Sequence, residues 1–256
     1  MIISENDKFI FIHIPKNGGT SVALSLEEHL KYNDIVIGGT KYGEKLLQIY
    51  QKQFGVSKHS LGIEIQDLVG KEKWEQFFTF GVVRNPYRRI VSIYTYSEKK
   101  LSSFFGTGIL HHSNKETLAH IPQRIKSQIK YLGAKVNSQY FKNTLWLLKW
   151  PDIKAYLDTA NFSEFIRHPF LMKDNSFRTQ WTWLSDRDRQ NLIVDRVIKL
   201  EEIESEWPKL CQDLGISCKL KFENKSASRS VELTPEDRSY IYSQFKIDFD
   251  KFGYLP

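Results

Sequence analysis

The chain has 256 residues, enough for one large α/β domain and few for two independent ones. Hydrophobic residues make up 41% of it and charged residues 26%, which is ordinary for a soluble globular protein. Lys and Arg number 37 against 30 Asp and Glu, and the formal charge of +7 favours anionic partners such as nucleotides or glycans. Because no run of like charges forms a basic tail, the composition does not favour nucleic acid as the partner.

The N-terminal residues and the cysteines indicate the cellular location of the protein. Met1 to Lys8 is polar and mixed in charge, unlike a signal peptide, and no apolar stretch nears the length of a bilayer span. Cys211 and Cys218 make a poor disulfide framework and lack zinc-ligand spacing. We therefore expect a cytoplasmic protein with no membrane span.

The first predicted elements are a strand, a glycine loop and a helix. Phe9–Ile14 is a β-branched and aromatic run that ends at Pro15, as in a buried parallel strand. The loop contains Gly18 and Gly19, and Thr20 or Ser21 is expected to cap the helix that follows.

Further along the chain, strands continue to alternate with helices. The expected order is a strand at Ile35–Ile37, a helix at Glu44–Phe54, a strand at Phe77–Val83, a helix at Tyr87–Lys100, a strand at Arg196–Leu200, an acidic helix start at Glu201 and a last helix opened by Thr234 and Pro235. The pattern predicts an α/β fold with three α/β/α layers, a mostly parallel central sheet and a single domain over residues 1–256. Residues 101–180 are less regular and are expected to form a helical, acceptor-side region.

The glycine loop has the features of an anion site. A loop that leaves a parallel strand and enters a helix directs backbone N–H groups at one point, where the helix dipole adds positive potential. Lys16 brings a full charge, and Thr20 and Ser21 bring hydroxyls. The lysine precedes the glycines, so the order of a Walker A loop is absent. A plain turn with a solvated lysine is the alternative.

A second basic segment follows the Phe77–Val83 strand. Arg84 lies at the carboxyl end of that strand, where ligands bind in open α/β sheets. Ser92 falls about two turns into the next helix, so a guanidinium and a hydroxyl can meet on one phosphate. The alternative is a solvated basic helix start.

Taken together, the two segments resemble a known pair of motifs. His13-Ile-Pro-Lys-Asn-Gly-Gly-Thr-Ser21 and Val83-Arg-Asn-Pro-Tyr-Arg-Arg-Ile-Val-Ser-Ile-Tyr94 resemble the donor-binding motifs of sulfotransferases that use PAPS, the 3′-phosphorylated sulfonate donor. The likeness is nearest to the carbohydrate branch, with heparan sulfate 2-O-sulfotransferases and bacterial relatives. It implies a P-loop nucleotide-hydrolase-like fold.

The resemblance also implies roles for individual residues. The 5′-phosphosulfate would be held by the first motif, with Lys16, Asn17, Gly18, Gly19, Thr20 and Ser21. Arg84 and Ser92 would hold the 3′-phosphate that remains on the product PAP. Asn17 stands where the family usually has threonine, which removes one hydroxyl contact and leaves the backbone cradle.

Later segments show a weaker likeness. Lys58-His59, Gln180 before Trp181–Leu184, Val197–Glu201 and Phe252–Tyr254 resemble segments of bacterial members. Asn224-Lys225-Ser226 resembles a loop that closes over the nucleotide, so Lys225 and Ser226 are candidate donor ligands.

The implied chemistry is in-line sulfonate transfer, in which positioning and charge stabilisation carry catalysis. Lys16 would neutralise the leaving phosphate oxygen, and His59, by its family position, would be the general base. His111, His112 and His120 are alternative bases, and Glu64 is another. No metal is required, and the acids near Glu201 and Asp248 are interpreted as helix-end and solvated-face charges.

The acceptor is expected to be a carbohydrate or a small hydroxylated molecule. Basic and aromatic residues of the acceptor-side region suit an acidic or neutral glycan, or else form ordinary surface and core: Lys126, Lys130, Tyr131, Tyr140, Trp146, Arg167 and Lys173. Two other functions stay open. One is a P-loop-like nucleotide kinase or hydrolase, and the other is a non-catalytic nucleotide- or polyanion-binding protein. The sequence does not indicate an oligomeric state.

Overall fold

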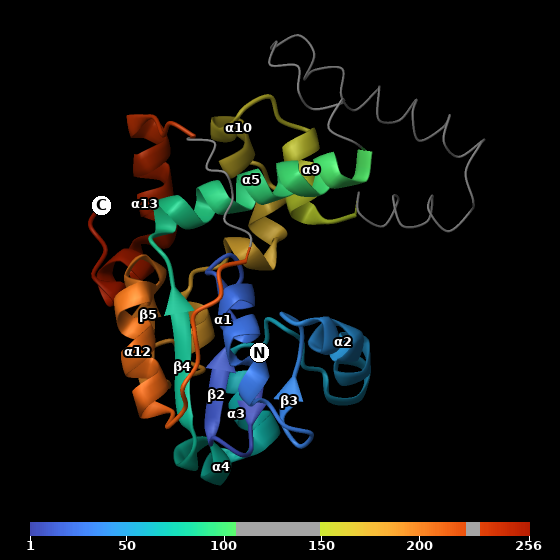
Figure 1. Ribbon diagram of the computed structural model, residues 1–256. Helices are drawn as coiled ribbons and strands as arrows, with labels where there is room; N and C mark the ends of the chain where they lie inside the picture. The colour runs from blue at the N-terminus through green and yellow to red at the C-terminus, as the bar shows by residue number, and fades with distance from the viewer. Residues whose placement is uncertain (106–148, 224–230) are drawn as a thin grey trace, which may run out of the picture. The chain divides into compact units, whose positions relative to one another are not determined.

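The computed structural model describes residues 1–105, 149–223 and 231–256. The chain divides into two compact units. The first comprises Met1–Arg89, Thr179–Ser228 and Arg238–Pro256, and the second comprises Ile90–Arg178 and Arg229–Asp237. Figure 1 labels the two long helices α5 (Pro86–Phe105) and α13 (Pro235–Phe252). Each of them contributes residues to both units. The second unit overlaps the region that the sequence sets apart.

The first unit is built on a sheet with strand order β3-β1-β2-β4-β5. Its strands are β1 (Ile2–Ser4), β2 (Phe9–Ile12), β3 (Ile35–Val36), β4 (Phe78–Val83) and β5 (Arg196–Lys199). β2 pairs with β4 and β4 with β5 in parallel, whereas β1 pairs antiparallel with both β2 and β3. The predicted α/β sheet is therefore observed as a mixed sheet whose central part is parallel.

Short helices connect the strands. In the first unit these are α1 (Gly19–Leu26), α2 (Lys41–Phe54), α3 (Gly62–Val69), α4 (Lys71–Gln76), α11 (Trp181–Leu184) and α12 (Ile203–Asp213), with 3₁₀ turns at Glu27–His29 and Leu200–Glu202. In the second unit they are α9 (Pro151–Leu157) and α10 (Phe162–Ile166), with 3₁₀ turns at Leu171–Lys173 and Asn175–Phe177. α5 begins at a proline. Proline has no backbone N–H, and this suits the first turn of a helix, where an N–H would have no intrahelical acceptor.

The central strands are apolar on both faces. Phe9 and Phe11 of β2 join a cluster with residues of α1 and α12, while Ile10 and Ile12 join a cluster with residues of α3, α4 and α11. Successive side chains of a strand point to opposite faces, so helices cover both faces of this part of the sheet. This explains the continuous apolar run in the sequence.

Two local expectations were wrong. The segment interpreted as polar begins with Met1, Ile2 and Ile3, which are at most 1% exposed, and it forms β1. The charged turn that follows hides this short apolar run in the sequence. In addition, α1 is not capped by Thr20 or Ser21: its N-cap is Gly18, in a left-handed conformation with φ of 74° and no side-chain cap.

The cysteines lie beside each other at the end of α12. The sulfur atoms of Cys211 and Cys218 are 3.2 Å apart, and both are free thiols. Burial raises the pKa of the Cys218 thiol to about 12, and the hydrogen bond with Cys211 adds to the shift. Among the helices of the described ranges, none has the length and apolarity needed to cross a membrane.

The packing of the core leads to a first testable prediction, on the stability cost of removing Phe80. Phe80 is fully buried in β4 and its ring stacks on Phe11 with centroids 5.1 Å apart. Phe80→Ala should lower the free energy of unfolding by about 3–5 kcal/mol, because the cavity adds to the lost apolar burial. Phe54→Ala is the control, since its side chain is 54% exposed and its loss should cost no more than about 0.5 kcal/mol. Urea denaturation measures both, and equal losses would contradict the packing described here.

Candidate active site

The loop between β2 and α1 forms a concave stretch of backbone. Lys16 and Gly18 have φ values of 69° and 74°, the left-handed conformation that turns successive N–H groups toward one side. The N–H groups of the first turn of α1 have no intrahelical acceptor and add to this set. Lys16, Gly18 and Thr20 are partly exposed, whereas Asn17, Gly19 and Ser21 are buried. The loop thus has the backbone features that suit an anion.

A buried histidine lies beneath the loop and makes Gly19 necessary. A Cβ atom on Gly19 would lie 2.2 Å from the ring of His13, which is 3% exposed. Burial lowers the pKa of His13 well below 6.5, so the ring is neutral at physiological pH. The loop backbone therefore packs directly on an imidazole, which leaves no room for a side chain at Gly19.

The second segment meets the first at this point. Arg84 directly follows β4, and its guanidinium Nη1 donates to the Lys16 carbonyl over 3.2 Å. The side chain is half-buried, and burial lowers the pKa of Arg84 against the opposing effect of Glu201. The Arg84 guanidinium, from a segment 68 residues further along the chain, thus contacts the backbone of the β2–α1 loop at the carboxyl edge of parallel strands.

Residues from two later segments support Arg84. Glu201 accepts a hydrogen bond from the Asn85 backbone N–H at 3.0 Å and another from the Tyr254 hydroxyl at 3.1 Å. Burial raises the pKa of Tyr254, and the adjacent Glu201 raises it further, so the hydroxyl remains protonated. Glu201 is therefore a hydrogen-bond acceptor that fixes the turn after Arg84.

His59 adjoins the same site through His13. Its Nδ1 lies 2.7 Å from the His13 carbonyl oxygen, and the two rings meet edge to face at 4.9 Å. The indole N–H of Trp183 donates to the His59 carbonyl at 3.1 Å and holds its backbone. Burial lowers the pKa of His59 to about 3, with a further contribution from the charge of Lys58.

The position of the Nδ1 proton follows from this hydrogen bond. A carbonyl oxygen only accepts, so Nδ1 must donate and carries the proton of the neutral ring. Nε2 then carries the lone pair. The ring is thereby held in the tautomer that can take up a proton at Nε2.

A model of the sulfotransferase family matches residues 1–255 of the chain. The chain belongs to the sulfotransferase family. Comparison with curated proteins and with solved structures finds no match. Members of the family transfer a sulfonate group and generally use PAPS as its donor. An anionic nucleotide is therefore the ligand to consider for the β2–α1 loop of this sulfotransferase.

The structure brings together most of the residues predicted for the donor, but they differ in what they offer. Lys16, Gly18, Thr20 and Arg84 are accessible at the loop. The Ser21 hydroxyl is already engaged, since it accepts from the Glu223 backbone N–H at 3.0 Å. That contact brings the chain to the loop just before residues 224–230, so the predicted ligands Lys225 and Ser226 lie outside the described residues.

Asn17 and Ser92, which were also predicted to bind the donor, have different surroundings. The Asn17 side chain is 1% exposed and its amide donates into the protein, to Val82 and Gln180, and not outward. Ser92 lies in α5, in the part of this helix that belongs to the second unit, and is half-buried. Asn17 thus has a supporting place in this sulfotransferase, where the sequence indicates a ligand.

The alternative bases divide in a similar way. Glu64 is exposed and accepts from the Leu61 backbone N–H at 2.8 Å, so it caps the start of α3. His111, His112 and His120 lie outside the described residues. Within the described ranges, no three His, Cys, Asp or Glu side chains are grouped to hold a metal ion.

One interpretation of an acidic residue was wrong. Asp248 is fully buried, and its carboxylate accepts from the backbone N–H groups of Gln180 and Trp181 at 2.8 and 2.9 Å. It lies on no solvated face. Sequence reasoning missed the roles of Asp248, Gln180 and His13, although His13 stands within the first motif and directly after β2.

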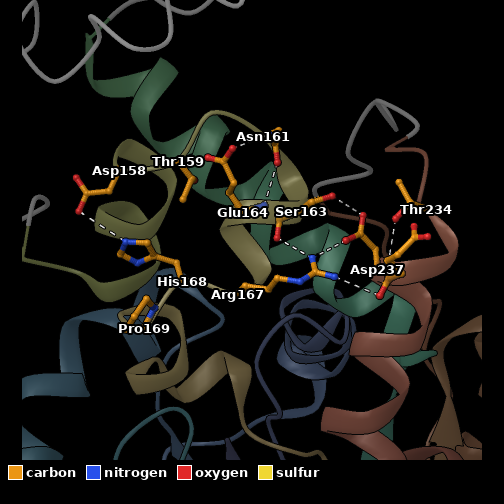
Figure 2. Close-up of a pocket in the computed structure, with 11 residues that line it drawn as sticks. Asp158, Thr159, Asn161, Ser163, Glu164, Arg167, His168, Pro169, Thr234 and Asp237 are labelled. Atoms are coloured by element: carbon orange, nitrogen blue, oxygen red, sulfur yellow. Dashed lines mark hydrogen bonds and ion pairs between the residues drawn. The ribbon is translucent and has the colours of Figure 1, made fainter.

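The second unit has a pocket of about 750 Å³, and Asp158, Arg167, His168 and Asp237 are among the residues that line it. Figure 2 shows Arg167 directed at Asp237 and His168 at Asp158. The Arg167 Nη1 to Asp237 Oδ1 distance is 2.6 Å, and Ser163 also donates to Asp237 at 2.7 Å. These contacts lower the pKa of Asp237 although burial opposes them. Arg167, predicted as a possible glycan ligand, is therefore part of an ion pair.

Other predicted acceptor residues also have ordinary packing roles or lie outside the described residues. The Lys173 ammonium lies 5.4 Å from the Phe170 ring centroid. The remaining candidates, Lys126, Lys130, Tyr131, Tyr140 and Trp146, fall in residues 106–148, which the structure does not describe.

The half-buried His59 makes the stability of this sulfotransferase depend on pH. In the unfolded chain its pKa returns to about 6.5, so between pH 6.5 and 3 the unfolded state binds a proton that the folded state does not. Stability from this group is complete above pH 6.5 and falls by about 1.4 kcal/mol per pH unit below it. Urea unfolding between pH 7.5 and 4.5 measures this slope.

His59→Asn is the comparison for this measurement. An asparagine amide retains a donor toward the His13 carbonyl and does not titrate, so the slope should decrease by one proton. His13 contributes in the same direction in both proteins, because its pKa is also lowered by burial. Parallel pH profiles of the two proteins would show that His59 does not titrate on unfolding.

Proposed function

We propose that this sulfotransferase takes the sulfonate group of PAPS and transfers it to a hydroxyl of a carbohydrate or another small hydroxylated acceptor. The family match supports sulfonate transfer and a nucleotide donor. The observation that carries the proposal is the contact of the Arg84 guanidinium with the Lys16 carbonyl, because it joins the two segments that the donor would bridge.

The chain has a suitable site for both anionic groups of the donor. The backbone of Lys16 to Thr20, with the Lys16 ammonium and the Thr20 hydroxyl, would hold the 5′-phosphosulfate. Arg84 would hold the 3′-phosphate, with Ser92 as a second ligand and Lys225 and Ser226 completing the nucleotide site. The glycine at position 19 keeps the backbone free of a side chain at this point, as close approach of a phosphate requires.

When bound, the donor supplies an activated sulfonate and a phosphate leaving group. Lys16 would stabilise the charge that develops on the leaving oxygen, since an ammonium is most effective where charge forms in the transition state. No other positive side chain lies within the β2–α1 loop itself.

His59 would take the proton of the acceptor hydroxyl at Nε2. Its tautomer leaves this nitrogen free of hydrogen, and burial keeps the ring neutral. A pKa of about 3 alone would make a weak base. The negative charge of a bound donor favours the imidazolium and would raise the pKa of His59 toward neutrality, so that it becomes an effective base in the complex.

Several broader expectations belong to the same proposal. We propose a three-layer, P-loop nucleotide-hydrolase-like arrangement, a single functional domain with residues 101–180 as its acceptor-side region, and a cytoplasmic location. The competing functions are a nucleotide kinase or hydrolase and a non-catalytic binding protein. The order of lysine before glycines disfavours the first. A single 3′-phosphate pocket at Arg84 and Ser92 disfavours the second, because a general polyanion binder has no use for one.

Binding of PAP tests the donor site. PAP at 100 times its dissociation constant should stabilise the protein by about 2.7 kcal/mol, whereas 5′-AMP, ADP and ATP with Mg²⁺ should not match it. Arg84→Ala should remove most of the shift. Arg88→Ala is the matched control, since it removes the same charge from an exposed position four residues away and should keep the shift. Stabilisation by ATP with Mg²⁺ above that by PAP would favour the kinase or hydrolase.

His59→Asn tests the base. Transfer of labelled sulfonate from PAPS to a panel of neutral oligosaccharides, uronic-acid oligosaccharides and phenols should fall by about 10²–10⁴-fold in kcat. The dissociation constant of PAP should stay within about twofold, because the asparagine amide keeps the contact with the His13 carbonyl. Undiminished transfer with the variant would assign the proton transfer to another group.

A further inference from the structure

Gln180 lies between the two donor segments, and its side chain is fully buried. Its Oε1 accepts from the Asn17 side-chain amide at 2.7 Å and from the Arg84 backbone N–H at 2.8 Å. One carbonyl oxygen is therefore shared by a residue of the first motif and a residue of the second.

The side-chain amide of Gln180 also pairs with the backbone of Arg84, as a neighbouring strand would. Its Nε2 donates to the Arg84 carbonyl at 2.8 Å, so both backbone groups of Arg84 pair with one side chain. β4 ends at Val83, one residue earlier. Buried backbone groups need such partners, and this pairing determines the direction in which Arg84 leaves the strand.

On the other side, Asn17 fastens the anion loop to the sheet. Its Nδ2 donates to the Val82 carbonyl at 2.8 Å as well as to Gln180. The adjacent Lys16 has a φ of 69°, a conformation that a residue with a side chain keeps only when its surroundings impose it. The Asn17 side chain, the Arg84 contact with the Lys16 carbonyl and the bond from Arg89 to the Pro15 carbonyl are among the contacts that hold this conformation.

Gln180 is itself held from α13. Asp248, which is fully buried, accepts from the Gln180 backbone N–H at 2.8 Å, and its second oxygen accepts from the Trp181 N–H. The Gln180 Nε2 also lies 3.4 Å from the same carboxylate. The side chain therefore has a defined orientation and is not free to turn its amide.

We infer that Gln180 is a positioning residue that holds the Lys16 loop and Arg84 in the relative geometry that binds the donor, with Asn17 as its partner. This inference rests on the proposed function. It explains why the first motif tolerates asparagine at position 17: the amide supplies a donor for the interior in place of a hydroxyl for the ligand. A merely structural Gln180 would affect stability and leave donor affinity unchanged.

The experiment compares Gln180→Met with a matched control, Thr79→Val. The methionine keeps length and removes the amide. Thr79 is equally buried, at the opposite end of β4, and its hydroxyl exchanges hydrogen bonds with Asp195 at 2.8 and 2.9 Å. Both variants should unfold at lower temperature. Only Gln180→Met should weaken PAP binding, measured by titration calorimetry on the folded protein, by about tenfold or more.

A second variant removes the hydrogen bond between Asn17 and Gln180 by changing Asn17. Asn17→Ser shortens the side chain and should weaken PAP binding in the wild-type background. It should have a much smaller effect in the Gln180→Met background, since the shared bond is already absent. If Gln180→Met does not fold, Asn17→Ser against Thr79→Val gives the same comparison.

Hydrogen exchange separates failure of this inference from failure of the proposed function. In the absence of ligand, Gln180→Met should accelerate exchange at the amides of residues 16–21 beyond any change in Thr79→Val. If the wild-type protein does not bind PAP, the donor assignment fails, and the exchange result still decides whether Gln180 holds the loop. Unchanged exchange, or normal PAP affinity in a destabilised Gln180→Met, would overturn the inference.

Discussion

In the central sheet, β2 and β4 run parallel, and their register aligns Ile12 with Gly81. The loops that follow two parallel strands leave the sheet at the same edge, so the Lys16 loop and Arg84 are brought together by strand pairing. The site of this sulfotransferase depends on that constraint. A shift of the register would separate the guanidinium from the Lys16 carbonyl and leave two unrelated basic segments.

Behind this edge, the protein interior contains several buried polar side chains. His13, Gln180, Arg89 and Asp248 are buried, and each occupies volume that apolar side chains could fill. Burial of polar groups lowers stability unless they are hydrogen-bonded. Their directional bonds determine a single geometry for the loop and for Arg84, which apolar packing would leave less defined. The loop and Arg84 are thus held rigidly, while the buried polar groups lower the free energy of unfolding. Such rigidity is expected where a site must not reorganise when charge develops.

His59 illustrates how the surroundings of a group set its chemistry. The hydrogen bond to the His13 carbonyl selects the tautomer, burial keeps the ring neutral, and Trp183 holds the backbone. None of these three effects can be inferred from the residues next to His59 in the sequence. Glu64, only five residues away, is engaged by the start of α3 and is directed to a capping role.

Much of the parallel core could be predicted because its signals are local. The apolar runs of β2 and β4, the glycine loop and the proline at the start of α5 each encode their structure within a few residues. β1 was missed because its apolar run is short and a charged turn follows it. Asp248 was misjudged because a polar residue in a sequence looks solvated unless its partners are known.

The order of strand, loop and helix, the two basic motifs and the family that they indicate could be recognised without a structure, since these depend on neighbouring residues. Which polar side chains are turned into the interior became clear only from the folded chain. The reason is distance along the chain: the partners of Asn17 are 65 and 163 residues away, and those of Gln180 lie in segments that meet only when the sheet has formed. Long-range hydrogen bonds leave no periodic trace in a sequence, whereas backbone conformation does.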